Sequence, residues 1–107
     1  MSGITTHVLD TASGRPASGV PVTLERERND DWQVVGGGTT DADGRLRTLL
    51  TEAPEEGTYR ITFNTGAYFP TGFFPSVTIT FRVSEGQEHY HVPLLLSPYG
   101  YSTYRGS

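Results

Sequence analysis

The amino-acid sequence predicts an all-β fold, built as a sandwich of two sheets. Clusters of Gly, Pro, Asn, Asp and Ser, which favour turns, recur about every eight to twelve residues along the chain. The runs between these clusters are rich in Val, Ile, Thr, Tyr and Phe, and several alternate apolar and polar residues as half-buried strands do. The length of 107 residues corresponds to one domain over residues 1–107.

Two strands are expected in the first quarter of the chain. Residues 4–9 alternate, so Thr5 and His7 lie on one face of their strand and their neighbours on the other. Residues 20–24 alternate in the same way. Because Pro21 has no N–H to donate to a neighbouring strand, this second strand should begin there or lie at a sheet edge.

The segment after the first Asp-Gly turn leaves helix and strand open. Its apolar residues fall at the spacing of a helical face, at Leu46, Leu49, Leu50 and Ala53. Asp43 could cap such a helix, and Pro54 would end it. The window is short and lies in a chain that is otherwise β-patterned, so the residues alone support both structures equally.

The second half of the chain is more regular. Residues 77–83 alternate strictly, and residues 59–63 follow the same pattern. Residues 89–96 are expected to form a further strand, followed by a turn at 97–100 that contains Pro and Gly. The remaining residues, 101–107, are rich in Tyr and predict a last strand.

Composition excludes several classes of protein. The net charge is −4 and no stretch gathers Lys and Arg, which argues against a nucleic-acid partner. The chain has no Cys, so a disulfide scaffold, a thiolate zinc site and a Cys nucleophile are excluded. No apolar run approaches the ~18 residues of a membrane helix, and the first residues lack the basic and apolar stretches of a secretory signal. We therefore expect a cytoplasmic protein without a membrane partner.

Three His residues are the candidates for chemistry near neutral pH. His89 and His91 lie two residues apart and share a strand face, whereas His7 belongs to the first predicted strand. Each could singly be an ordinary surface residue, but hydrolysis needs a group that titrates near neutrality, and few others are present. The three could also bind zinc, although no Asp or Glu joins them in the strand. We expect a site without a metal.

Two other motifs are better explained as local structure. Asp41 and Asp43 with Gly44 resemble part of a calcium loop, but Leu50 stands where the loop requires a bidentate Glu. An Asp-Gly turn is the preferred interpretation. The glycines at 36–38 lack the Lys and Ser or Thr of a phosphate loop and predict a flexible strand end. No Gly-x-Ser-x-Gly motif of a serine hydrolase occurs.

Several motifs together resemble the transthyretin-related family over nearly the whole chain. They are HVLD at 7–10, GRPA at 14–17, DGR at 43–45, FPSVTITF at 74–81 and LLSPYGYSTYRGS at 95–107. The terminal YRGS at 104–107 is the most specific, because it distinguishes the hydrolases of this family from the hormone-carrying transthyretins, which lack it.

The resemblance implies a transthyretin-like sandwich of seven to eight strands, in which residues 46–50 form a strand. It also implies pairing of subunits edge to edge into a dimer, and then a homotetramer with a central channel and sites at the subunit interface. Related proteins carry a short helix before Phe74, but only residues 70–73 are present there, so that helix is left open.

For function, the resemblance implies hydrolysis of 5-hydroxyisourate, a product of urate oxidation, to 2-oxo-4-hydroxy-4-carboxy-5-ureidoimidazoline. The catalytic residues implied are His7, Arg45 and His91, without a cofactor. The residues implied to bind the substrate are Tyr104, Arg105, Gly106 and Ser107. The alternative is a transthyretin-like module that binds a small ligand without catalysis. The joint presence of the two His and Arg45 with the terminal tetrapeptide argues against this alternative.

Overall fold

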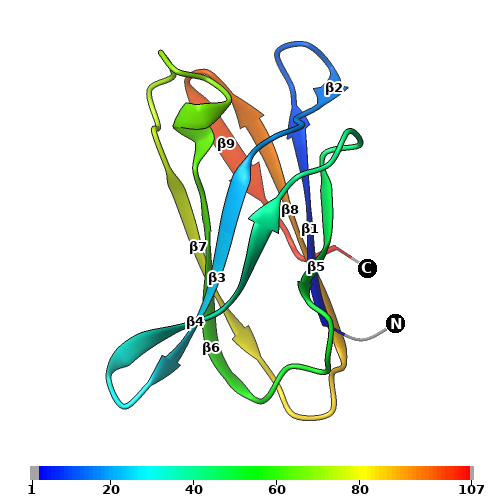
Figure 1. The fold of residues 1–107 in the computed structure, drawn as a ribbon, viewed down its shortest axis with the longest axis vertical. Coiled ribbons are helices and arrows are strands. Elements are labelled where there is room, and N and C mark those ends of the chain that lie inside the picture. Colours follow the sequence, from blue (N-terminus) through cyan, green and yellow to red (C-terminus); the bar gives the residue numbers. More distant parts are fainter. Residues whose placement is uncertain (1–2, 107) are drawn as a thin grey trace.

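Residues 3–106, which the computed structural model describes, form two packed sheets (Figure 1). The first sheet consists of β1 (Gly3–Asp10), β2 (Arg15–Pro16), β5 (Arg45–Leu50), β8 (His89–Ser97) and β9 (Gly100–Thr103). The second consists of β3 (Pro21–Arg28), β4 (Asp31–Thr39), β6 (Gly57–Phe63) and β7 (Val77–Val83). The predicted two-sheet sandwich is confirmed. The described residues form nine strands rather than seven or eight, because the two-residue β2 is a separate short strand.

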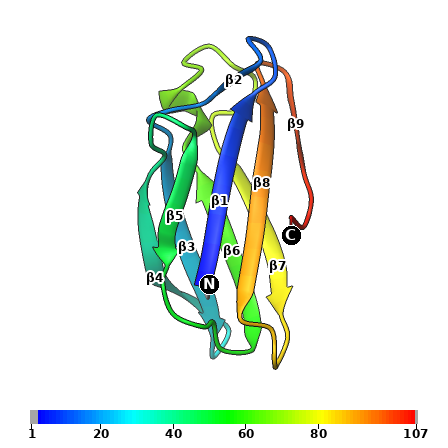
Figure 2. The same ribbon diagram turned by 90° about the vertical axis from the view of Figure 1, so that its right-hand side faces the viewer.

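Strand β1 lies in the middle of the first sheet. It runs parallel to β8 along its whole length, and its other side pairs antiparallel with β5 and β2. Strand β9 pairs antiparallel with β8 and forms an edge. Figure 2 shows β1 and β8 side by side, with β9 beyond β8. This pairing brings Thr5 next to His91, 86 positions later in the chain.

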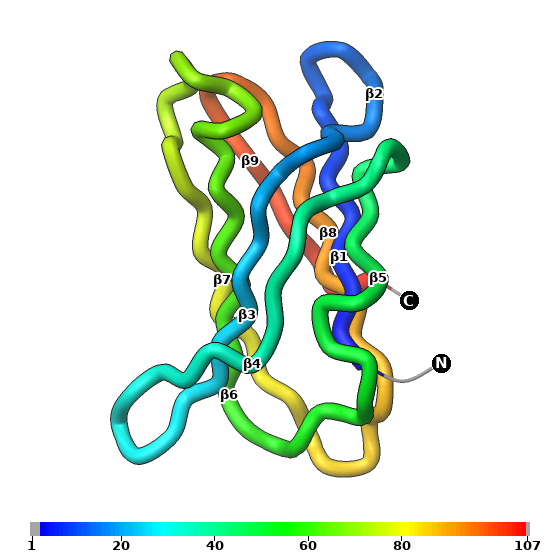
Figure 3. The backbone as a smooth tube through the Cα atoms, in the orientation of Figure 1, coloured from blue at the N-terminus to red at the C-terminus, as the bar shows by residue number. Residues whose placement is uncertain are grey.

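The second sheet is antiparallel throughout, in the order β4-β3-β6-β7. Figure 3 shows these four strands as one layer of the sandwich. Strand β3 begins at Pro21, as predicted, and lies between β4 and β6. Pro21 is the first residue of the strand, so its missing N–H removes little from the hydrogen bonding between the strands.

Apolar side chains from both sheets fill the space between them. The core includes Ile4, Val8, Leu24, Ile61, Phe63, Leu94 and Leu96, all fully buried. Burying such a side chain contributes about 1.5–3 kcal/mol, so the alternation in β1 and β8 determines which face of the first sheet points inward. The intervening residues, among them His7 and His91, are thereby directed to the outer face of this sheet.

Strand β5 covers the segment for which the spacing of apolar residues did not distinguish a helix from a strand. Leu46 pairs with Thr6 and Leu50 with Ile4 of β1, and the register shifts between these two pairs. Because of this irregularity, Leu46 and Leu49 can both face the core, and both are buried. The strand that the family resemblance implied is confirmed, and the irregularity explains the apparent helical spacing.

The glycines at 36–38 lie within β4, not in a flexible strand end as the sequence suggested. A Cβ on Gly36 would lie 1.9 Å from the carbonyl oxygen of Leu49, and one on Gly38 would lie 2.9 Å from Leu46 Cδ1. Both distances are below normal contact. These glycines therefore let β4 approach β5 more closely than a residue with a side chain would allow.

Helical structure in residues 3–106 is limited to the 3-10 helix η1 (Thr65–Ala67). Residues 70–73, where related proteins carry a short helix, contain turn and bend conformations only. The helix left open by the sequence is therefore absent from the part of the chain described. In that same part, no helix is long and apolar enough to cross a membrane.

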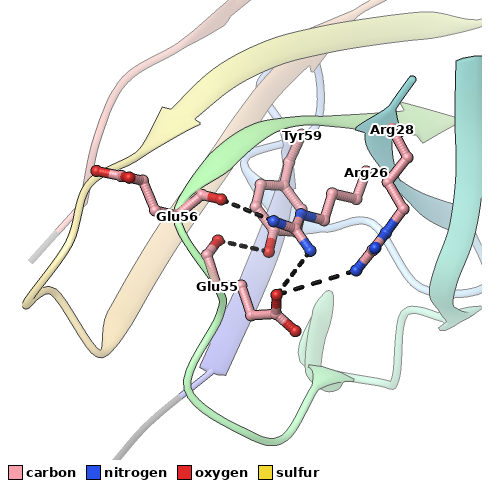
Figure 4. Close-up of polar contacts among 5 residues, drawn as sticks. All are labelled: Arg26, Arg28, Glu55, Glu56 and Tyr59. Atoms are coloured by element: carbon pink, nitrogen blue, oxygen red, sulfur yellow. Dashed lines mark hydrogen bonds and ion pairs between the residues drawn. The ribbon is translucent and has the colours of Figure 1, made fainter. Parts of the chain in front are cut away.

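The connection between β5 and β6 is held by a polar cluster (Figure 4). Glu55 Oε2 accepts a hydrogen bond from Arg26 Nη1 at 3.0 Å and lies 3.9 Å from Arg28 Nη2. Arg26 Nη2 donates to the Glu56 carbonyl at 2.8 Å, and the Tyr59 hydroxyl donates to the Glu55 carbonyl at 2.7 Å. These bonds anchor the connection to β3 and β6.

Candidate active site

The three side chains predicted to be catalytic lie on the outer face of the first sheet. His7 of β1 and Arg45 of β5 are directly paired across the strands. His91 of β8 is paired with Thr5, two residues before His7 on the same face of β1. Residues in register on adjacent strands point to the same side of a sheet, so the sheet brings these three side chains together.

A tight turn places Arg45 at the first position of β5. Asp41 Oδ1 accepts hydrogen bonds from the main-chain N–H groups of Asp43 at 2.8 Å and Arg45 at 3.0 Å. Gly44 has a φ of +73°, and a Cβ there would lie 2.4 Å from the Val8 carbonyl oxygen. The Asp-Gly turn preferred from the sequence is confirmed, and its Asp carboxylate is used within the turn itself.

His91 is half-buried, and its surroundings favour the neutral imidazole. Burial lowers the pKa of His91 below 6.5, and the nearby charges of His7, Arg45 and His89 lower it further. The ring nitrogen Nδ1 lies 2.8 Å from the hydroxyl oxygen of Thr5. At neutral pH the ring is therefore uncharged and able to accept a proton.

The segment after β9 returns to His91. The Gly106 N–H donates to the His91 carbonyl at 2.8 Å, and the two residues form an antiparallel bridge. A Cβ on Gly106 would lie 2.6 Å from His91 Cδ2, so only glycine fits against the ring without a shift. Gly106, which was predicted to bind the substrate, is therefore in direct contact with the predicted catalytic residue His91.

Tyr104 and Arg105 of the tetrapeptide make their contacts away from His91. The Arg105 guanidinium stacks over the Tyr90 ring at 4.6 Å from its centroid, and its Nη2 donates to Gln87 Oε1 at 3.3 Å. Tyr104 and Arg105 both line a cavity of about 240 Å³ beside Ile79 and Phe81 of β7. Ser107 lies outside the described residues.

Two further residues, Thr5 and His89, lie on the face that carries His7 and His91, as the alternation predicted. Thr5, whose alternation with His7 was visible in the sequence, contacts His91 only through the long-range pairing of β1 with β8. His89 shares the face with His91, and its Nδ1 is buried without a hydrogen-bond partner among the residues described. Over residues 3–106, no group of three or more His, Asp and Glu side chains is arranged to hold a metal ion.

Comparison with known proteins identifies the family. The HIUase/Transthyretin family model matches residues 4–106. A 5-hydroxyisourate hydrolase of Salmonella typhimurium is 49% identical over 97% of this chain and 80% of its own length. The structure of Klebsiella pneumoniae 5-hydroxyisourate hydrolase is 37% identical and superposes with a TM-score of 0.86 over 97% of this chain and 98% of that one.

A transthyretin is similar in backbone to the same degree. Sea bream transthyretin in complex with thyroxine is 34% identical, with a TM-score of 0.90 over 96% of this chain and 93% of that one. The sandwich alone therefore does not separate hydrolase from carrier, and the site residues must do so. The family model matches residues 4–106, and the Salmonella relative is 49% identical over 97% of this chain, so this chain belongs to the HIUase/Transthyretin family.

Proposed function

We propose that this chain is a hydrolase that opens a cyclic amide of 5-hydroxyisourate, a product of urate oxidation. The observation that carries the proposal is the common position of His7, Arg45 and His91 on the outer face of one sheet. The relatives from Salmonella and Klebsiella bear the name 5-hydroxyisourate hydrolase and match nearly the whole chain. The sequence identity to these relatives and the chemistry of the site thus support the same activity.

In the proposed reaction, a water molecule attacks a ring carbonyl of the substrate. A neutral imidazole takes one proton from the water as the new C–O bond forms, a step worth about 10²–10⁴ in rate. The carbonyl π electrons move to the oxygen, and the Arg45 guanidinium stabilises the negative charge that develops there. When the ring C–N bond breaks, the imidazolium returns its proton to the departing nitrogen. His7 and His91 share this proton transfer.

Binding of a small ligand without catalysis is the competing function. Sea bream transthyretin, crystallised with thyroxine, has the same sandwich. A carrier needs an apolar channel, whereas this sheet face presents two imidazoles and a guanidinium. An imidazole whose pKa is held below 6.5 by burial, and then by neighbouring charges, is suited to proton transfer at neutral pH.

We further propose that the protein is a homotetramer with its sites at a subunit interface. Strands β7 and β9 are sheet edges, which natural proteins usually cover. Tyr99, Tyr101 and Tyr104 expose large aromatic surfaces on or beside β9. The outer sheet face that carries His7 would be enclosed by a second dimer, which would keep bulk water from the reacting groups.

The proposed function is tested by making the unstable substrate in place with urate oxidase. The absorbance of 5-hydroxyisourate should decay faster when this protein is added, in proportion to its concentration. Decay at the spontaneous rate, with a folded protein, would refute the activity. Prior dialysis against a strong chelator should leave the rate unchanged, whereas a loss that zinc restores would support the metal alternative.

A further inference from the structure

Thr5 makes a polar contact with the ring of His91. Its side chain is 6% exposed, and its hydroxyl oxygen lies 2.8 Å from His91 Nδ1. The two residues are directly paired in the parallel ladder between β1 and β8, with their side chains on the outer face. This contact fixes one of the two ring nitrogens of His91 and leaves Nε2 for another partner.

The neighbouring Thr6 shows what a purely structural threonine does in the same strand. Thr6 is 1% exposed, and its hydroxyl donates to the main-chain carbonyl of Val92 at 2.6 Å. It therefore also bonds across to β8, but on the inner face, where it satisfies a backbone group. Thr5 instead bonds to a titratable side chain. The two residues form a matched pair with opposite faces and different partners.

We propose that Thr5 is a positioning residue for the hydrolysis, which accepts the Nδ1–H of His91 and so leaves Nε2 unprotonated as the general base. The inference rests on the proposed function, since it assigns a role within that reaction. A neutral imidazole carries one N–H and one lone pair, so a partner that holds the proton on Nδ1 determines that the lone pair is on Nε2. Catalytic triads orient their His by the same principle.

The surroundings of the ring agree with this tautomer. A hydrogen bond with the Thr5 main chain raises the pKa of His91, although burial lowers it by more. A contact that raises this pKa favours the ring that carries a proton on both nitrogens, as donation from Nδ1 does. Among residues 3–106, hydrogen bonds to the His91 ring are limited to Nδ1, and Nε2 is left for water or substrate.

The charged and titratable groups that face His91 come from three strands. They are His7 of β1, Arg45 of β5 and His89 of β8, and each lowers the pKa of His91 after the larger effect of burial. The Arg105 guanidinium of the returning segment stacks on Tyr90 instead. Among residues 3–106, the hydrogen bond to Nδ1 involves Thr5 and none of these groups, so Thr5 is the group that determines the tautomer.

The first test compares three variants in the assay with urate oxidase. Thr5→Val removes the hydroxyl and keeps the shape, and it should lower kcat by about 10- to 100-fold with KM nearly unchanged, because only proton transfer is impaired. Thr5→Ser should restore most of the rate. Thr6→Val, the matched control, should keep kcat near that of the original protein. A Thr5→Val protein as active as Thr6→Val would overturn the proposal.

The pH profile tells which group donates in the Thr5–His91 contact. If Thr5 accepts from Nδ1–H, Thr5→Val removes a partner of the protonated ring, the pKa of His91 falls, and the acidic limb of kcat moves to lower pH. A move to higher pH would mean that the hydroxyl had been the donor and would overturn the proposal.

Nuclear magnetic resonance of the unaltered protein labelled with ¹⁵N-histidine reads the tautomer directly and needs no variant to fold. We expect the His91 proton on Nδ1, and a proton on Nε2 would contradict the assignment. This readout does not depend on activity. An unaltered protein that is inactive but carries the proton on Nδ1 would therefore refute the proposed function without refuting the geometry.

Discussion

His91 combines partial burial with the electrostatic effect of its neighbours, and both act on its pKa in the same direction. Burial lowers its pKa first, and the charges of His7, Arg45 and His89 add to this effect. The ring is therefore neutral at physiological pH. The same Arg45 that disfavours the imidazolium is directly paired with His7, where it can stabilise negative charge on the substrate. The Arg45 guanidinium thus helps to keep His91 neutral and is also placed to stabilise an oxyanion of the substrate.

A pH dependence follows from this lowered pKa. The neutral ring is the active form, so kcat/KM should fall only when the pH drops through a pKa that lies below 6.5. His89→Asn removes one of the charges that lower this pKa and should move the acidic limb upward, towards 6.5. The measurement is kcat/KM over the acidic and neutral range for both proteins. A limb above 6.5 in the unaltered protein would contradict the account.

The contact between Gly106 and His91 gives a second prediction at this scale. Gly106→Ala should lower activity about tenfold or more, because its Cβ would lie 2.6 Å from His91 Cδ2 and force the ring or the segment to shift. The melting temperature should change little, since Gly106 contributes a single isolated bridge. Gly100→Ala is the control, because a Cβ there meets only Ser97 Oγ, at an ordinary 3.7 Å. Equal activity in the two variants would remove Gly106 from the site.

Among the elements, the segment that follows β9 links the end of the chain to the site. A truncation that ends at Thr103 should abolish hydrolysis while the sandwich still folds. The pairs of β9 with β8 run from Gly100 to Thr103, so this truncation removes none of them. Substrate decay and melting temperature should be measured for both chains. A folded truncation with the full rate would show that residues 104–107 have no part in the reaction.

The strands were predictable where one face is buried and the other is not. Residues 77–83 and 89–96 alternate or run apolar in the sequence, and the structure has β7 and β8 there. Strand β4 was not predicted, because its three glycines interrupt the alternation of apolar and polar residues. Glycine is needed at positions 36 and 38 because β5 lies too close for a side chain there. The irregular register of β5 gave its apolar residues a helix-like spacing in the sequence. The strand can be recognised only from its pairing with β1.

The candidate site was predictable in its members and not in its contacts. Motifs of the family pointed to His7, Arg45 and His91, and the structure places them on one sheet face. The contact of Thr5 with His91 depends on the parallel register of strands that lie 86 residues apart. No local pattern encodes that register. It follows from the packing of the whole sandwich.

For the whole molecule, the proposed assembly would complete the site. Light scattering at micromolar concentration should give a mass four times the 11.7 kDa of one chain. The edge strands β7 and β9 and the exposed Tyr99 and Tyr101 supply the surfaces that such an assembly would cover. An active protein with the mass of a single chain would contradict the proposal that the sites lie between subunits.

The same sandwich occurs in a transthyretin and in a 5-hydroxyisourate hydrolase, so the backbone does not by itself determine the function. The backbone superposes on sea bream transthyretin and on Klebsiella 5-hydroxyisourate hydrolase with TM-scores of 0.90 and 0.86. We propose that the two imidazoles and the guanidinium on β1, β5 and β8 are the groups that carry out hydrolysis on this sandwich. The central claim is therefore that these three side chains perform the reaction together.

The most direct test of that claim is kcat/KM for 5-hydroxyisourate in His7→Asn, Arg45→Gln and His91→Asn, with His89→Asn as the control on the same sheet face. We predict a loss of about 10²-fold or more in each of the first three, with melting temperatures close to that of the original protein. His89→Asn should keep most of the activity at neutral pH. Full activity in any of the first three variants, in a protein that remains folded, would contradict the assignment of that residue to the reaction.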